Sequence, residues 1–345
     1  MSVQQLVEIS NYYGANPDFV LAGGGNTSYK TDEFLYIKGS GTTLATITAD
    51  GFVKMDIAAL KNIWNTTFSG DEAERERQVL ADLMAARCAG EESKRPSVET
   101  SLHQLFPQTF VVHTHPALIN GLTCAKDGEA WAKKIFGDDV IWIQPTKPGY
   151  ILAAAVRGEL ESYKARSGKD ANIVFLANHG VFIAGNTLDE IKATTDKVVS
   201  AIMPHIKRVP DFAPIQRTAE LPQTDGVAVL ECNAELDRYI ANSAAFAPIA
   251  SVYTPDHMVY YKIPAFAEDM ASLDTSKRAV AVKGIGLVAM EASEKSAKII
   301  VDLFNDTMKI AAYAENFGGG AFMPDWLIDF INNWEAESYR KSISK

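Results

Sequence analysis

Apolar residues at helical spacing open the chain. Leu6, Ile9 and Tyr13 recur on one face of a helical period, which predicts an amphipathic helix over the first 14 residues that ends at Gly14. The highly charged stretch 71–87 predicts a second amphipathic helix, with its DEAERER start forming a solvated face. The N-terminal part of the chain therefore contains helices with one face available for packing.

Three apolar tracts predict strands. Residues 35–55 mix β-branched and aromatic side chains with glycine-rich turns, a pattern typical of strands joined by tight loops. Residues 110–118 read as a buried strand that stops at Pro116. Residues 173–185 read as two strands joined through Asn178-His179-Gly180.

Helical segments lie between these strands. Residues 96–106 begin like a helix with Ser97 as its cap, and Thr187 to Glu190 has the spacing of a capping box for a helix that extends to about residue 207. Because strands alternate with helices, the fold class is α/β.

Residues 209–226 carry three prolines and no periodicity, so they are the predicted linker. We therefore expect a first domain over 1–208 and a C-terminal α/β block over 227–345. One segment of this block is similar to a segment of the first domain, because residues 280–293 align without a gap on residues 174–187.

The aligned segments are either a degenerate half-repeat or a chance similarity. Gly180 falls on Gly286, and His179 falls on Ile285. If the segments are copies, 280–315 should form a strand, a turn, a strand and a long helix.

Composition excludes several classes of protein. The 345 residues suffice for about two domains, and 47% hydrophobic with 22% charged residues is the composition of a soluble globular protein. The net charge of −10 argues against a general binder of nucleic acids or anionic membranes. No apolar run reaches about 18 residues, and the polar N-terminus does not resemble a signal peptide. Three scattered cysteines suggest a reducing compartment, so we expect a cytoplasmic protein.

Histidines are the strongest chemical signal. His113 and His115 alternate onto one face of the predicted strand, and His179 lies at the turn between two other strands. Three imidazoles with an open fourth position are typical of a catalytic zinc site, although an isolated pair of this spacing is more often unrelated to metal. Glu99 could reach such a metal or its substrate; alternatively, it is a first-turn glutamate that complements the helix dipole.

The motifs GGGNTSYK, KGSG, PSVET, HTHP and NHGVFIAG occur in this order and resemble the class II aldolase/adducin family over residues 1–207. The resemblance implies a three-layer α/β/α fold with a largely antiparallel central sheet, instead of the parallel sheet that the alternation of elements suggests. It also implies zinc, or another divalent metal, held by His113, His115 and His179. Glu99 would ligate the metal in the free enzyme and act as acid and base during the reaction.

The same resemblance assigns phosphate binding to Asn26, Thr27, Ser40, Gly41 and Ser97. Glycines, hydroxyls and an amide suit this task without a large basic patch.

Two positions depart from the family pattern. Val98 stands where family aldolases often have a second serine, and no tyrosine occurs near residue 134, where a fuculose-phosphate aldolase has its proton donor. Tyr150 is the nearest tyrosine.

The C-terminal block, with TPDH at 254–257, KGIG at 283–286 and NWEAESYRK at 333–341, resembles the tail of the aldolase part of rhamnulose-phosphate aldolase/lactaldehyde dehydrogenase-type proteins. KGIG lacks the GxGxxG pattern, so nicotinamide binding is unsupported. His257 either approaches the active site or is a structural histidine.

These features favour a zinc-dependent sugar-phosphate aldolase that cleaves a ketose 1-phosphate into dihydroxyacetone phosphate and an aldehyde, with the metal stabilising the enediolate. A pentulose-phosphate 4-epimerase or a sugar-phosphate dehydratase of the same family, or a non-catalytic adducin-like interaction module, are the alternatives. We also expect a homo-oligomer, either a dimer or a tetramer.

Overall fold

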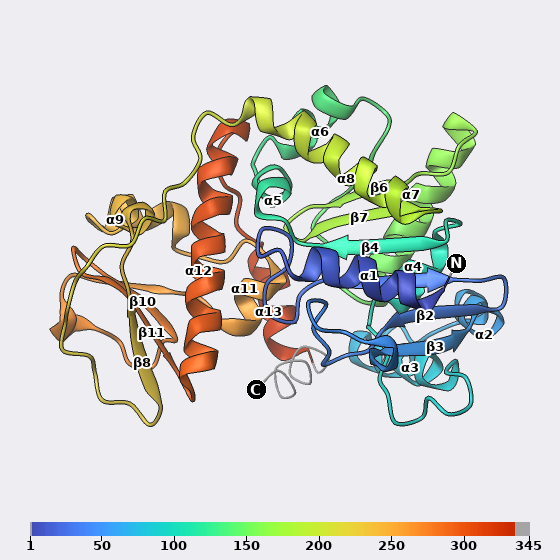
Figure 1. The fold of residues 1–345 in the computed structure, drawn as a ribbon, viewed down its shortest axis with the longest axis horizontal. Coiled ribbons are helices and arrows are strands. Elements are labelled where there is room, and N and C mark those ends of the chain that lie inside the picture. Colours follow the sequence, from blue (N-terminus) through green and yellow to red (C-terminus); the bar gives the residue numbers. More distant parts are fainter. Residues whose placement is uncertain (1, 335–345) are drawn as a thin grey trace. The chain divides into compact units, whose positions relative to one another are not determined.

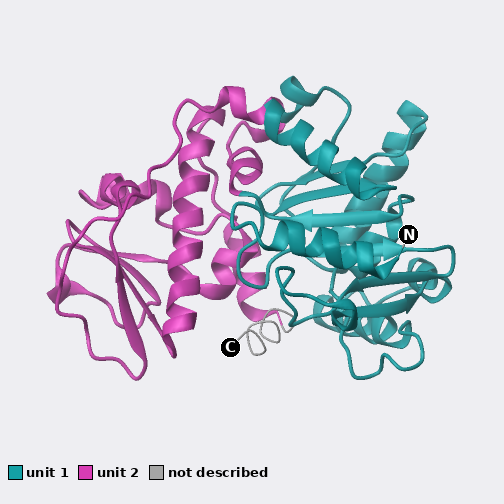
Figure 2. Ribbon diagram, in the orientation of Figure 1, with its two compact units in different colours: residues 1–116, 132–201, 344 teal, residues 117–131, 202–343, 345 magenta. Residues whose placement is uncertain are grey.

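The computed structural model describes residues 2–334, which divide into two compact units (Figure 2). Unit 1 comprises the residues up to 116 together with 132–201, and unit 2 comprises 117–131 together with the described residues from 202 onward. The division predicted from the sequence assigns 117–131 to the first domain. In the structure this segment contains α5 (Ala117–Thr123), which packs against α12 (Glu294–Ala314) within unit 2. The motif at 333–341 lies mostly outside the described residues.

Unit 1 is built on a seven-stranded sheet with the strand order β3-β2-β1-β4-β7-β6-β5 (Figure 1). All neighbouring strands are antiparallel except β5 and β6, which are parallel. The strands are β1 (Asn26–Lys30), β2 (Phe34–Lys38), β3 (Phe52–Asp56), β4 (Phe110–Thr114), β5 (Ile141–Ile143), β6 (Ile173–Leu176) and β7 (Gly180–Gly185). The helices are α1 (Val3–Gly14), α2 (Ile57–Asn62), α3 (Glu72–Ala85), α4 (Thr100–Leu105), α6 (Gly128–Phe136), which crosses the unit boundary, α7 (Tyr150–Ser167) and α8 (Leu188–Ile202).

Helices cover both faces of this sheet. On one face α4 and α7 contribute Leu102 and Val156 to an apolar cluster with strand residues such as Phe182. On the other face α1 and α8 are joined by the Tyr13 hydroxyl, which donates to Thr195 Oγ1 at 2.8 Å. The predicted three-layer α/β/α fold with a largely antiparallel sheet is confirmed.

Two predicted helix boundaries are wrong. The cap of α4 is Glu99 rather than Ser97, because the backbone N–H of Ser97 donates to Lys38 O (3.1 Å) and its hydroxyl accepts from the backbone N–H of Glu99 (3.2 Å). Ser97 therefore belongs to a turn that precedes the helix. The α8 helix ends at 202 instead of 207, since Pro204 lacks the N–H that an α-helical hydrogen bond requires.

Unit 2 contains a four-stranded sheet in the order β8-β11-β10-β9. Residues 209–226, the predicted linker, form no helix and no strand. The strands are β8 (Val227–Glu231), β9 (Ala265–Ala267), β10 (Ala279–Val282) and β11 (Gly286–Glu291), and the helices besides α5 and α12 are α9 (Ala234–Tyr239), α10 (Ser243–Phe246), α11 (Pro255–Tyr260) and α13 (Asp325–Asn333).

The predicted order of strand, turn, strand and long helix after residue 279 is confirmed by β10, β11 and α12. The similarity extends to pairing, because β4-β7-β6-β5 of unit 1 and β8-β11-β10-β9 of unit 2 have the same order and the same strand directions. Leu176 pairs with Gly180, and Val282 pairs with Gly286, which are the positions that the sequence alignment superposes. Agreement in register favours a duplicated unit over chance similarity, since a slip of one residue would exchange the two faces of a strand.

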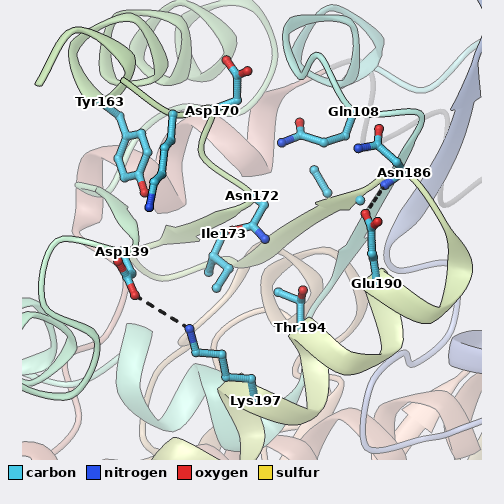
Figure 3. Close-up of a pocket in the computed structure, with 13 residues that line it drawn as sticks. Gln108, Asp139, Tyr163, Asp170, Asn172, Ile173, Asn186, Glu190, Thr194 and Lys197 are labelled. Carbon is cyan, nitrogen blue, oxygen red and sulfur yellow. Dashed lines mark hydrogen bonds and ion pairs between the residues drawn. The ribbon is translucent and has the colours of Figure 1, made fainter. Parts of the chain in front are cut away.

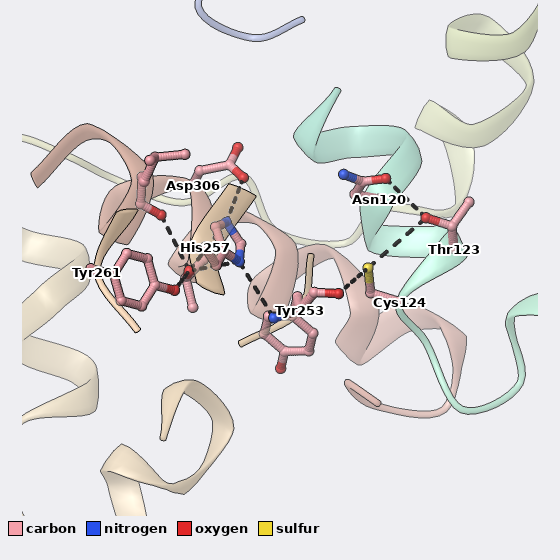
Figure 4. A network of polar contacts seen from close by, with 9 residues as sticks. Asn120, Thr123, Cys124, Tyr253, His257, Tyr261 and Asp306 are labelled. Carbon is pink, nitrogen blue, oxygen red and sulfur yellow. Dashed lines mark hydrogen bonds and ion pairs between the residues drawn. The ribbon is translucent and has the colours of Figure 1, made fainter. Parts of the chain in front are cut away.

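Unit 2 also contains a buried polar network around His257 (Figure 4). The fully buried imidazole donates from Nε2 to Asp306 Oδ2 at 3.0 Å, and its Nδ1 accepts from the backbone N–H of Tyr253 at 3.4 Å. The Thr307 hydroxyl contacts the same ring and the hydroxyl of Tyr261. Both ring nitrogens are thus occupied, as expected of a structural histidine.

Within residues 2–334, no helix has the length and apolar character needed to cross a membrane. Cys88, Cys124 and Cys232 are all free thiols.

Candidate metal centre

The sheet of unit 1 brings the three predicted histidines together. His113 lies in β4, His115 follows the end of that strand, and His179 lies in the turn between β6 and β7. One ring nitrogen from each histidine lies within 4.8 Å of the others, and the Nε2 atoms of His113 and His115 are 2.9 Å apart. The cluster forms because β4 and β7 are neighbours in the sheet, an arrangement that joins residues more than 60 positions apart.

The β6–β7 turn has a local geometry that suits its sequence. Asn178 adopts a left-handed conformation with φ of 56°, which asparagine tolerates better than most residues. The backbone N–H of His179 then donates to Leu176 O at 3.2 Å and closes the turn. This tight turn directs the imidazole of His179 toward the other two rings.

His113 is oriented by its surroundings for ligation through Nε2. Its Nδ1–H donates to Val181 O at 3.0 Å, and its ring stacks on Phe182 with centroids 4.1 Å apart. A backbone acceptor on Nδ1 fixes the tautomer in which the Nε2 lone pair is available.

Glu99 completes the cluster. The residue is 6% exposed, with Oε2 3.5 Å from His113 Nε2 and Oε1 3.9 Å from His179 Nε2. Oε2 accepts a hydrogen bond of 2.6 Å from Asn26 Nδ2, whereas the buried Oε1 has no hydrogen-bond partner among the described residues. Glu99 occupies the N-cap position of α4, but its side chain makes no capping hydrogen bond.

A buried carboxylate oxygen without a donor is costly, and a cation would remove that cost. Three imidazoles and one carboxylate are a donor set that zinc and other divalent metals accept. The described residues therefore fit the metal that the sequence pattern suggests.

Two of the segments assigned to phosphate binding lie side by side. The backbone N–H of Ser40 donates to Arg95 O at 2.8 Å, and its hydroxyl donates to Pro96 O at 3.1 Å. Gly41 is exposed in the turn that follows, and Ser97 is next to Pro96 and largely buried. Ser40, Gly41 and Ser97 thus come from one small region of unit 1.

Asn26 and Thr27 point to opposite faces of β1. Thr27 is fully buried, with its hydroxyl 2.6 Å from that of Ser10 in α1. Asn26 instead lies beside His113 in the sheet, and its amide contacts Glu99 and His103. The alternation of side chains along a strand separates these two residues.

His103 is fully buried and contacts Asn26, although no sequence motif points to it. The signal that could have found it is its spacing of four residues from Glu99, which places two residues on the same side of a helix. Tyr150 packs between Trp64 and Phe68, with ring centroids 5.6 and 5.1 Å away.

A cavity of about 400 Å³ lies elsewhere in unit 1 (Figure 3). Its lining includes Ile173 at the start of β6, Gly185 at the end of β7 and Lys197 of α8, and Figure 3 shows Lys197 directed toward Asp139. The histidine cluster lies at the opposite ends of these two strands, where β6 turns into β7. None of the predicted site residues lines this cavity.

Unit 1 is thus a three-layer α/β domain with a largely antiparallel sheet, and its histidine cluster lies where β4 ends and β6 turns into β7. Residues 4–203, more than half of the chain, match the Class II Aldolase and Adducin N-terminal domain, so the chain belongs to the class II aldolase/adducin family.

Two individual proteins are similar to this chain over part of its length. The N-terminal class II aldolase domain of a conserved protein from Thermoplasma acidophilum is 27% identical, with a TM-score of 0.50 over 60% of this chain and 94% of that chain. The uncharacterized oxidoreductase YuxG of Bacillus subtilis is 28% identical over 206 residues, which make up 57% of this chain but only 28% of YuxG. The present chain therefore spans less than a third of that relative.

The fuculose-1-phosphate aldolase of Thermus thermophilus is 17% identical over 57% of this chain and 90% of that chain, with a TM-score of 0.37. A similarity this low says nothing about the activity of the present chain.

Proposed function

We propose that this protein is a zinc-dependent aldolase that cleaves a ketose 1-phosphate into dihydroxyacetone phosphate and an aldehyde. The observation that carries the proposal is the convergence of His113, His115, His179 and Glu99, in which the buried Oε1 of Glu99 lies 3.9 Å from His179 Nε2 and accepts no hydrogen bond among the described residues. Burying a carboxylate oxygen without a hydrogen-bond donor lowers the stability of the fold, and a non-catalytic interaction module gains no function that would offset this loss.

The three histidines would hold the metal through one nitrogen each. When bound, the cation supplies Lewis-acid stabilisation of the negative charge that carbon–carbon bond cleavage leaves on substrate oxygens. Glu99 is the group that would move the proton, because its carboxylate lies at the edge of the cluster and has one oxygen without a hydrogen bond.

The substrate phosphate would bind where the 38–41 turn meets residues 95–97. This region offers the backbone of Gly41 and the hydroxyls of Ser40 and Ser97. Inorganic phosphate should then compete with the substrate, and Ser97→Ala should raise KM more for phosphorylated sugars than for free sugars.

The direct test is an assay of the purified, zinc-loaded protein against a panel of ketose 1-phosphates, with dihydroxyacetone phosphate detected by a coupled reductase. We expect release from at least one substrate, and loss of release in Glu99→Gln. A panel that yields no dihydroxyacetone phosphate would refute the aldolase assignment.

The same reactions analysed for other products separate the family alternatives. An epimerised pentulose phosphate or a dehydrated sugar phosphate would assign the cluster to one of those reactions. A folded protein that binds no stoichiometric metal would favour the interaction module.

A further inference from the structure

A line of hydrogen bonds runs from the core of unit 1 to Glu99. Asn26 and Ser28 lie on the same face of β1, two residues apart, and both contact the imidazole of His103 in α4. Ser28 Oγ is 2.7 Å from His103 Nδ1, His103 Nε2 contacts Asn26 Oδ1, and Asn26 Nδ2 lies 2.6 Å from Glu99 Oε2. All four side chains are at least nine-tenths buried.

The direction of every bond in this line follows from the carboxylate. An ionised carboxylate only accepts hydrogen bonds, so the amide nitrogen of Asn26 must face Glu99. The amide oxygen then faces His103, and because it only accepts, His103 must carry its proton on Nε2. Nδ1 of the neutral ring is left to accept from the hydroxyl of Ser28. One tautomer of one histidine therefore satisfies the whole line.

The surroundings of His103 hold the ring neutral and in place. Burial, with smaller contributions from His113 and Lys30, keeps the pKa of His103 well below its usual value. Lys30, on the same face of β1, donates from Nζ to the carbonyl oxygens of His103 (3.0 Å) and Gln104 (3.2 Å) at the end of α4. The ring also meets Phe182 edge-on, with centroids 5.3 Å apart.

We propose that His103 is a positioning residue for Glu99: its Nε2–H group holds the Asn26 amide so that Nδ2 binds Oε2 of Glu99 and Oε1 stays open. We call this line of hydrogen bonds, from Ser28 through His103 and Asn26 to Glu99, the relay. It explains why one oxygen of the Glu99 carboxylate has a hydrogen-bond donor and the other has none. It also gives Asn26 a task different from the phosphate binding that the sequence motif suggests. The proposal rests on the proposed function in that Glu99 is the group that moves the proton.

The tautomer can be measured without substrate or metal. In protein labelled with ¹⁵N-histidine, a long-range ¹H–¹⁵N correlation spectrum distinguishes the two neutral tautomers and the imidazolium. The signals of His103 are those that disappear in His103→Gln. At pH 7.5 we expect a neutral ring protonated on Nε2. A proton on Nδ1, or on both nitrogens, would overturn the relay.

Zinc affinity tests what the relay does for the carboxylate. His103→Phe keeps an aromatic ring against Phe182 but has no donor, whereas His103→Gln keeps an N–H near the position of Nε2. We expect the dissociation constant for zinc, measured by competition with a chromogenic chelator, to rise about 10- to 100-fold in His103→Phe, the range found when supporting partners of metal ligands are removed. His103→Gln should recover most of this loss. Wild-type affinity in His103→Phe, or an equal loss in both variants, would contradict the proposal.

Asn26→Ala provides a test that does not depend on the folding of His103→Phe. The relay predicts weaker zinc binding and a lower kcat, while a phosphate-binding role predicts a higher KM for phosphorylated substrates alone. The latter result would refute the relay. The tautomer of His103 and the zinc affinity are both measured without substrate. A protein that cleaves no ketose 1-phosphate would therefore overturn the proposed aldolase function, whereas the relay is decided by the tautomer and the zinc affinity alone.

Discussion

Replacing Gly180 with alanine would insert a methyl group into the metal centre. The added Cβ would lie 2.5 Å from Thr114 O, 2.6 Å from His115 Cδ2 and 3.4 Å from His113 Cε1. Carbon atoms pack at about 3.5–4.0 Å, so the ring of His115 or the end of β4 must move by about 1 Å. Metal sites tolerate deviations of only about 0.2 Å in ligand distance, and Gly180→Ala should therefore weaken metal binding.

The size of the effect can be bounded. Overpacking of this kind costs about 1–3 kcal/mol in the metal-free protein. Zinc at about 1,000 times its dissociation constant stabilises the native state by about 4.1 kcal/mol, and a tenfold weaker site reduces this gain to about 2.7 kcal/mol. Gly180→Ala should thus be less stable without metal and should also gain less stability when zinc is added.

Urea denaturation with and without zinc, together with a zinc titration, measures both quantities. Gly158→Ala is the matched control, because Gly158 is exposed in α7 and an added Cβ meets nothing within 4 Å. This control should gain about 0.5–1 kcal/mol from helix propensity and bind zinc as the wild type does. Unchanged zinc affinity in Gly180→Ala would show that the geometric reasoning about the site is wrong.

Further outcomes concern the ligands, the proton and the metal count. His113→Ala should lose stoichiometric zinc in metal analysis, since two imidazoles hold the ion poorly; retention of one zinc per chain would remove His113 from the ligand set. Glu99→Gln should still hold one zinc per chain on the three imidazoles, with a higher dissociation constant, and should lose turnover by about 10²-fold or more; normal turnover would end its assignment as acid and base. Because His103 is neutral in the native protein and takes up a proton on unfolding, its contribution to stability is complete above about pH 6.5 and falls as the pH drops below that value, by up to about 1.4 kcal/mol per pH unit. Metal-free wild type should therefore lose stability more steeply between pH 6.5 and 4.5 than His103→Gln in urea titrations, and equal slopes would contradict a neutral ring. Metal analysis should give one zinc per chain, because the positions of unit 2 that correspond in register to the three histidines are Leu230, Cys232 and Ile285; two tightly bound ions would refute this correspondence.

The sequence by itself determined the elements whose signals are local. The amphipathic α1, the charged α3, the all-buried strand β4 and the β6–β7 pair follow from periodicity and turn residues, because these preferences act over a few neighbouring positions. Local alignment was also sufficient to predict the order of β10, β11 and α12. The family motifs supplied the antiparallel sheet, which periodicity alone does not distinguish from a parallel one.

Only the tertiary structure decided what the side chains of the site contact. Strand alternation sends Thr27 into the core beneath α1 and leaves Asn26 on the face of His113, although the two residues are adjacent in one motif. His103 carries no motif of its own, and only the fold brings its ring from α4 into contact with Asn26 and Ser28 of β1. Hydrogen-bond partners are set by the meeting of elements far apart in the sequence, and no local preference encodes which donor will face which acceptor.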